Sequence, residues 1–287
     1  MTNLKYFVQF IFVLFLFLIF KLINLKSSRI LSEKIFSLIG PLFRSNKLSF
    51  SNLDNAFSNL NLLEKKKIMK QVWANYGKIF AEYMFIKNFS DENFLKENIL
   101  LENYDELLKV KNNSESVIFI SGHFNNFELM AMMIQKSGIN LSAVYRPLNN
   151  IFLNPFMENI RKKYICRNQI KKGISGTKEL LKDFKKGNSI ALMIDQRVSE
   201  GIKCKFFNKD AYTTTIPAQF VKRFNAKIIP VYIERKENNK FKMIFSRPLL
   251  FNNEETIEDI TSQLNVILEK MILKNPEQWI WTHNRWK

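Results

Sequence analysis

Short apolar runs alternate with helix-like stretches in the part of the chain that follows Asn113. The runs have the length and the β-branched or aromatic content of buried strands. They cover residues 116–121, 141–145, 189–194, 227–233 and 241–245, and the helix-like stretches cover 128–135, 154–163, 176–185, 217–224 and 257–273. This alternation predicts an α/β fold with a central, largely parallel sheet flanked by helices.

A long apolar segment precedes this region. Residues 6–20 read YFVQFIFVLFLFLIF, with Gln9 as the polar member. Since Lys21 can extend its amine to the interface, residues 6–25 give about twenty residues, near the length that spans a ~30 Å hydrocarbon core. No small-residue cleavage site follows, so we favour an uncleaved transmembrane helix over a signal peptide, which remains the alternative.

Charges around the apolar segment predict its orientation. Lys5 precedes it, whereas Lys21, Lys26, Arg29 and Lys34 follow it. The positive-inside rule then places the body on the cytoplasmic side of the membrane, as a single-pass protein. We expect a membrane anchor over residues 1–28 and one α/β domain over 29–287. Residues 30–43 fit an interfacial amphipathic segment or a core helix, and 64–85 a long helix.

The chain is strongly basic, with 44 Lys and Arg against 26 Asp and Glu and a formal net charge of +18. A Lys-rich composition explains this charge as well as selection for an anionic partner does. No helix-turn-helix, zinc-finger or RNA-recognition pattern is visible, so we expect no nucleic-acid partner. Cys166 and Cys204 are too few for a disulfide framework or a four-ligand zinc site, which fits a reducing compartment.

A histidine directly after the first strong strand is the main catalytic candidate. Residues 116–121 run into Gly122, His123 and, five positions after the histidine, Glu128. In a continuous helix the two side chains would point about 140° apart, so they can meet only if His123 lies in the turn and Glu128 in the first helical turn. We expect Glu128 to accept from one imidazole nitrogen, leaving the other as general base toward a substrate hydroxyl. A structural histidine is the alternative.

Polar residues also follow the other strands. Arg146 follows residues 141–145, and Asp195, Gln196 and Arg197 follow 189–194, while Arg161 lies on a helix between them. The planar guanidinium binds phosphate or carboxylate through two hydrogen bonds, although surface salt bridges explain each arginine equally well. Residues 276–286, which contain three tryptophans, fit an interface-seeking segment or an aromatic lid on the core.

These motifs together resemble the bacterial lipid A biosynthesis acyltransferases, the late lauroyl and myristoyl transferases of the lysophospholipid acyltransferase-like superfamily. The motifs are the amino-terminal anchor, GHFNNFE at 122–128, VYRP at 144–147, IDQR at 194–197 and PEQWIWTHNRWK at 276–287. The resemblance implies that His123 and Glu128 are the catalytic pair and that Arg161 and Asp195 are functionally important. The expected substrate-binding set is Asn126, Arg146, Arg161, Asp195, Gln196 and Arg197.

The implied reaction transfers a fatty acyl chain from acyl carrier protein to a hydroxyl of a phosphorylated glucosamine lipid of the Kdo-lipid IVA type, without a metal or an organic cofactor. An acyltransferase for a lysophospholipid, a glycolipid or an aminolipid is the alternative, and a non-enzymatic protein that holds anionic lipid is a third. Family members usually carry Gly in the loop at residues 206–217. Asn208 and Thr215 depart from that pattern, which affects the expected acyl length and acceptor preference.

Overall fold

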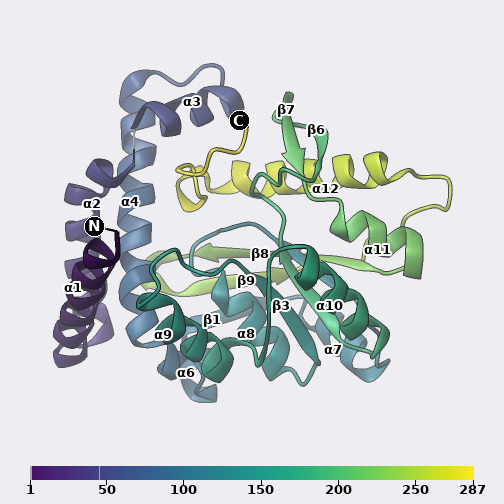
Figure 1. The fold of residues 1–287 in the computed structure, drawn as a ribbon, viewed down its shortest axis with the longest axis horizontal. Helices are drawn as coiled ribbons and strands as arrows, with labels where there is room; N and C mark the ends of the chain where they lie inside the picture. The colour runs from purple at the N-terminus through teal and green to yellow at the C-terminus, as the bar shows by residue number, and fades with distance from the viewer. Residues whose placement is uncertain (1, 45) are drawn as a thin grey trace.

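The computed structural model describes residues 2–44 and 46–287 and shows a seven-stranded sheet between helices (Figure 1). The strand order is β1-β9-β8-β2-β5-β3-β4. The strands β8, β2, β5, β3 and β4 are parallel, whereas β9 is antiparallel to β8 and pairs in parallel with the edge strand β1. The predicted α/β class is confirmed. The strands are β1 (Ile99–Glu102), β2 (Ile118–Ser121), β3 (Leu141–Tyr145), β4 (Asn168–Lys171), β5 (Ser189–Met193), β8 (Ile228–Arg235) and β9 (Phe241–Phe245).

Helices cover both faces of the sheet. One face packs under α10 (Ile174–Lys185), α11 (Ile216–Phe224), α12 (Ile257–Lys274) and part of α4 (Leu62–Met84). The other packs under α5 (Ile86–Phe89), α6 (Glu92–Asn98), α7 (Tyr104–Asn112) and α8 (Glu128–Lys136). In β2, Ile118 and Ile120 join the first core and Phe119 the second. Burial on both faces explains why this strand is a continuous apolar run in the sequence.

The amino-terminal region forms helices beside the sheet. They are α1 (Thr2–Leu22), which is long and apolar enough to cross a membrane, α2 (Leu25–Phe43) and α3 (Asn46–Ala56). Asn24 caps α2 by accepting from Ser27 N at 2.9 Å, so the helical break precedes the expected domain boundary, which falls inside α2.

The helix α2 packs closely on α4, as expected of a core helix. A Cβ atom on Gly77 of α4 would lie 2.4 Å from the backbone oxygen of Ser32, and one on Gly40 would lie 2.3 Å from Trp73. Arg29 of α2 also donates to the buried Glu82 of α4 at 2.7 Å. Close contact at two glycines and a buried ion pair therefore fix α2 against the domain.

Two kinds of element were absent from the sequence prediction. The first is short edge strands, β1 and β4, of which β4 contains Asn168 and Lys171 and lacks a continuous apolar run. The second is the antiparallel hairpin of β6 (Ile202–Phe206) and β7 (Lys209–Thr213). In its turn, Phe207 and Asn208 have φ of 49° and 58°, which explains why glycine would be favoured in this loop.

The helix predicted over residues 154–163 changes geometry before its end. The α-helix α9 (Leu153–Ile160) continues as a π-helical turn, η1 (Arg161–Ile165). Such wide turns occur often at functional sites, and this one begins at an arginine that was singled out from the sequence.

Candidate active site

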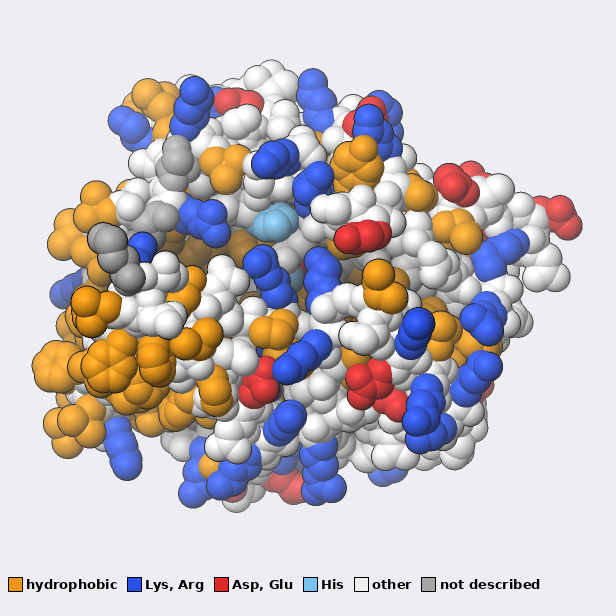
Figure 2. Space-filling model, viewed as in Figure 1, with side chains coloured by type: hydrophobic (Ala, Val, Ile, Leu, Met, Phe, Trp, Pro, Cys, Tyr) orange, Lys and Arg blue, Asp and Glu red, His pale blue; other side chains and the backbone are white. Residues whose placement is uncertain are grey.

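The carboxyl ends of the parallel strands meet at one edge of the sheet, and a pocket of about 420 Å³ opens there. In open α/β sheets this edge is where ligands bind. Figure 2 shows histidine at a hollow that Lys and Arg side chains surround. Of the predicted residues, those that line the pocket are His123, Glu128, Arg146, Arg161 and Gln196.

His123 is held by a carboxylate from the neighbouring strand. Because β2 and β5 are adjacent in the sheet, the segment after β2 lies beside Asp195 after β5. Asp195 Oδ1 lies 2.7 Å from His123 Nδ1, and Asp195 Oδ2 accepts from His123 N at 2.7 Å and from Trp279 Nε1 at 2.8 Å. The remaining ring nitrogen, Nε2, lies 3.4 Å from Gln196 Nε2. A carboxylate on Nδ1 favours the tautomer in which Nε2 can accept a proton.

The structure corrects the expected partner of His123. Among the described residues, the hydrogen bonds of the Glu128 carboxylate go to Arg161 and Tyr83, not to the imidazole. Arg161 binds Glu128 Oε1 through Nε at 2.8 Å and Nη2 at 2.7 Å, and Tyr83 donates a short hydrogen bond to the same oxygen. Glu128 does begin α8 directly after the turn, as expected, but Asp195 is nearer to the ring. The spacing within residues 122–128 could not show this because Asp195 is remote in sequence.

The charges in the pocket follow from burial and from these contacts. Burial alone would raise the pKa of Asp195, but the interaction with His123 and the hydrogen bonds from His123 and Trp279 hold it below its usual value. Burial alone would lower the pKa of Arg161, but Glu128 and Tyr83 raise it, so the arginine stays charged. Burial lowers the pKa of His283 to about 4. His283 is therefore neutral near pH 7, and its Nε2 accepts from Arg197 N at 3.1 Å.

Besides Asp195, two predicted residues lie outside the lining of the pocket. Asn126 is buried, and its Nδ2 donates to Glu82 Oε2 at 3.0 Å, so it fixes the loop after β2 to α4. Arg197 donates through Nε to the backbone oxygen of Lys287 at 3.0 Å and lies 5.4 Å from the ring centre of Tyr212. Both hold segments next to the site.

Several site residues were not predicted because distant segments bring them in. Arg44 follows α2, and Lys172 follows β4, and both line the pocket. Tyr83 comes from α4 and reaches Glu128, as described above. Trp279 and Trp281 are 1% and 0% exposed, so the aromatic tail is a lid on the core. Of these segments, only the tail was noticeable in the sequence, through the motif PEQWIWTHNRWK. That motif fitted a lid on the core and an interfacial segment equally well.

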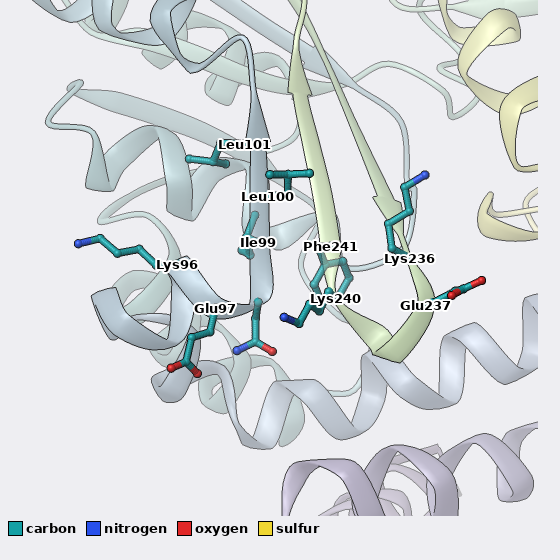
Figure 3. Close-up of a pocket in the computed structure, with 10 residues that line it drawn as sticks. Lys96, Glu97, Ile99, Leu100, Leu101, Lys236, Glu237, Lys240 and Phe241 are labelled. Atoms are coloured by element: carbon teal, nitrogen blue, oxygen red, sulfur yellow. The ribbon is translucent and has the colours of Figure 1, made fainter.

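A larger cavity, of about 660 Å³, lies beside the edge strand β1 (Figure 3). Its lining combines apolar side chains such as Leu100 and Phe241 with Lys96, Glu97 and Lys240. These side chains offer no general base beside a nucleophile or an oxyanion site, so we place the chemistry in the pocket of His123. Over residues 2–44 and 46–287, no three His, Cys, Asp or Glu side chains lie close enough together to hold a metal ion.

Comparison with known proteins identifies the family of the chain. The family model of bacterial lipid A biosynthesis acyltransferases matches residues 1–287. The chain belongs to this family. It is therefore an acyltransferase, of the class that transfers groups other than amino-acyl groups, in lipid A biosynthesis, as its motifs had suggested.

Individual members of the lipid A acyltransferase family are distant in sequence. The chain is 24% identical over 265 residues to the lipid A biosynthesis palmitoleoyltransferase of Escherichia coli K12, covering 90% of this chain and 84% of that protein. It is 23% identical over 250 residues to the lipid A biosynthesis lauroyltransferase of the same strain, covering 85% and 79%. It is 22% identical over 253 residues to lipid A biosynthesis acyltransferase 2 of Shigella flexneri, covering 86% and 80%. Membership implies an acyl donor and a lipid A-type acceptor.

Proposed function

We propose that the protein transfers a fatty acyl chain from an acyl carrier protein thioester to a hydroxyl of a Kdo-lipid IVA-type acceptor. The observation that carries this proposal is the pairing of His123 Nδ1 with Asp195 in a pocket at the carboxyl ends of the strands. Such a histidine can remove a hydroxyl proton near neutral pH, and the activated oxygen can then attack the thioester. No protein nucleophile is needed.

In the proposed reaction His123 is the protein group that accepts and returns the proton. As the acceptor hydroxyl attacks the thioester carbonyl carbon, its proton moves to Nε2. The tetrahedral intermediate then collapses, the carbon–sulfur bond breaks, and the imidazolium returns the proton to the departing sulfur. Asp195 stabilises the imidazolium and fixes the ring, as the carboxylate does in other His–carboxylate pairs. His123 is thus the proposed catalytic base.

Glu128 acts in this proposal through Arg161. Two hydrogen bonds from Arg161 and one from Tyr83 fix its carboxylate at the wall of the same pocket. Among the described residues, Arg161 Nη1 is buried without a hydrogen-bond partner, although Arg161 lines the pocket. An unpaired guanidinium N–H can donate to the oxyanion or to an acidic group of the acceptor. Glu128 is then a positioning residue for Arg161, beside the catalytic histidine.

The lining also supports an anionic acceptor. Arg44, Arg146 and Lys172 line the pocket with Arg161. Burial lowers the pKa of Lys172, and the nearby positive charge of Arg146 lowers it further, so the two cations are close enough to repel each other. A phosphate group would relieve that repulsion. We assign Gln196, whose amide lies beside His123 Nε2, and Arg146 to substrate binding.

The domain and membrane assignments complete the proposal. In this proposal an amino-terminal anchor attaches one α/β catalytic domain to the bacterial inner membrane, and the Lys and Arg residues after α1 support a position of that domain on the cytoplasmic side. Acyl carrier protein and a newly made lipid acceptor are both accessible on that side. The sequence alone favours a helix that spans the membrane once. Whether α1 spans the membrane depends on how it packs against the domain.

The test is the acyl-transfer rate of His123→Ala with an acyl carrier protein thioester and a tetraacylated lipid A precursor. Loss of a general base typically costs about 10²–10⁴-fold in rate, and we expect a loss in that range. Lys178→Ala, at an exposed position of α10 outside the lining of the pocket, is the control and should keep the wild-type rate. Wild-type turnover by His123→Ala would refute the assignment. Equal transfer to a lysophospholipid or a glycolipid would favour the alternative acceptors.

A further inference from the structure

The apolar helix α1 packs on the catalytic domain along its length. Near its start, the Phe7 and Phe10 rings lie 5.5 Å and 6.1 Å from the ring of Phe152. Near its end, the Phe17 and Phe20 rings lie 5.1 Å and 6.1 Å from that of Phe80 in α4. A helix that only tethers a domain to a membrane would lack such contacts in its membrane-spanning part. Here the domain lies beside the helix.

The pocket lies at the amino-terminal end of α1. Pro147, Leu148 and Asn149 line the pocket, and the next residue, Asn150, donates through Nδ2 to the backbone oxygen of Tyr6 at 2.8 Å. The carboxyl-terminal end of α1 instead contacts α4 and α2, where Ser28 Oγ donates to Phe20 O at 3.2 Å. The mouth of the pocket is therefore level with the first turns of α1 and distant from Lys21.

This arrangement conflicts with a simple span. With 21 residues at ~1.5 Å each, α1 is about 31 Å long, which equals the hydrocarbon thickness. If Lys21 marked the cytoplasmic end of a span, the pocket mouth would lie near the opposite surface of the bilayer. Residues that lie against α1, such as Met84 and Phe156, would be held at bilayer depth. The exposed charges of Lys87 and Lys162 are only a few positions from them in the chain. Charged side chains are strongly unfavourable at the centre of a bilayer.

The free face of α1 is nevertheless unsuited to water. Figure 2 shows a broad hydrophobic surface patch where Figure 1 places α1. An open groove of about 480 Å³ between α1, Met84 and Phe156 continues this patch, and Lys21 is one of the residues that line it. Apolar patches of this kind mark membrane or protein contacts. The exposed apolar side chains of α1 are Leu4, Phe7, Val8, Ile11, Phe12, Phe15, Leu18 and Leu22.

We infer that α1 lies in the plane of one leaflet, with its free face among the acyl chains and both of its ends on the side of the catalytic domain. Lys5 and Lys21, exposed near the two ends of the helix, then both reach the anionic headgroups of that leaflet. The pocket mouth opens at headgroup level, where a lipid can enter without leaving the membrane. The orientation rests on the packing of α1, and only the choice of the cytoplasmic leaflet rests on the proposed function.

Cysteine labelling of the full-length protein in bacterial membranes tests this topology. Asn3→Cys and Ser27→Cys place a thiol at an exposed position near each end of α1, and Asn253→Cys reports the side of the domain. The native Cys166 and Cys204 are buried, and the unsubstituted protein controls for their labelling. A membrane-impermeant maleimide is added to spheroplasts and, separately, to inverted inner-membrane vesicles.

We expect all three introduced thiols to react in inverted vesicles and to stay unlabelled in spheroplasts. Labelling of Asn3→Cys from the side opposite to Asn253→Cys would show a span and overturn the inference. Labelling of all three thiols in spheroplasts would keep the in-plane helix but refute the cytoplasmic site of the proposed function. Acyl transfer measured on the same membranes reports the proposed reaction independently, so the two ideas can fail separately.

Discussion

The two carboxylate oxygens of Asp195 accept hydrogen bonds from three donors, so we expect substitution of Asp195 to disturb the site strongly. The donors are the ring and the backbone of His123 and the indole of Trp279. An amide in place of the carboxylate has one acceptor oxygen and no charge, so it cannot serve all three or stabilise an imidazolium.

Asp195→Asn should therefore reduce acyl transfer by about 10²–10⁴-fold, the usual range for a disabled general base. The measurement is kcat with saturating donor and acceptor, accompanied by thermal unfolding in detergent to establish that the variant is folded. Asp210→Asn is the matched control, because Asp210 is an exposed partner of Lys205, and its rate should equal that of the wild type. If a folded Asp195→Asn retains full kcat, the His–Asp pair has no catalytic importance.

Arg161 and Glu128 form a buried pair whose geometry depends on the planar guanidinium. A lysine keeps the charge but cannot bind one carboxylate through two nitrogens and also reach Tyr83. We expect Arg161→Lys to lower the free energy of unfolding by about 1–3 kcal/mol through lost charged hydrogen bonds. It should also raise KM for the lipid acceptor.

Thermal unfolding and acceptor titration measure the two effects of Arg161→Lys. Arg167→Lys, at an exposed position just beyond η1, is the control and should change neither quantity. An unchanged midpoint of unfolding would mean that the pair contributes no net stability, and an unchanged KM would place Arg161 outside acceptor binding.

At the scale of residues, His123, Arg146 and Gln196 could be assigned to one edge of the sheet because each follows a strand whose end could be read, and the structure brings Arg161 to the same pocket from the helix between them. The sequence pattern assigned the wrong carboxylate to His123. Pairing between His123 and Asp195 depends on which strands are neighbours in the sheet, and the order β2-β5 cannot be read from the spacing of motifs.

Among the elements, α4 connects the anchor to the site. Its Gly77 touches α2, its Phe80 contacts α1, its Glu82 binds Asn126 and its Tyr83 binds Glu128. Glu82 is fully buried, and it also accepts from Arg235 Nη1 at 2.6 Å. A displacement of α4 would therefore change the membrane-facing surface and the pocket together.

Gly77→Ala tests this close packing. The new Cβ would lie 2.4 Å from the backbone oxygen of Ser32, so α2 and α4 must separate. Overpacking costs about 1–3 kcal/mol, partly offset by the higher helix propensity of alanine, which is worth about 1 kcal/mol. We expect a lower midpoint of thermal unfolding in detergent. Gln71→Ala, at an exposed position of the same helix, should leave the midpoint unchanged or raise it. A midpoint for Gly77→Ala that is at least that of the wild type would contradict this account of the α2–α4 contact.

The elements predicted best were those with a clear hydrophobic pattern in the sequence. The strands at the centre of the sheet are continuous apolar runs because helices cover them on both sides, and α12 and α4 show helical spacing. The edge strands β1 and β4 and the β6–β7 hairpin lack such a signal. Their pairing is decided by neighbours far away in the sequence, so local patterns could not reveal them.

The whole molecule should lose stability as the pH falls from about 6.5 to about 4. The pKa of His283 is lowered by burial to about 4 from its usual value of 6.5. In that pH window the unfolded chain binds a proton at this residue that the folded protein does not bind, so protonation favours unfolding. Above pH 6.5 both states are neutral, and the contribution to stability is complete.

Thermal unfolding midpoints measured from pH 7.5 to pH 4 check this dependence on His283. His283→Asn cannot titrate, so its midpoint should fall less over the same window than that of the wild type. Parallel curves for the two proteins would show that His283 has no lowered pKa. Lys287→Ala, at the exposed end of the same tail, serves as a control that should retain the full pH dependence.

The contact between Asp195 and the carboxyl-terminal tail also bears on when, during synthesis, the active site is complete. Translation proceeds at about 5–20 residues per second, so α1 leaves the ribosome many seconds before Trp279 is made. The tail supplies the indole that binds Asp195, and Asn52 Nδ2 binds the backbone oxygens of Trp281 and His283 at 2.8 Å and 2.7 Å. In the proposed membrane-bound enzyme, a nascent chain would therefore carry an incomplete site, and we expect acyl transfer to begin only after synthesis is almost finished. Premature stops in the last dozen or so codons should yield membrane-bound but inactive protein.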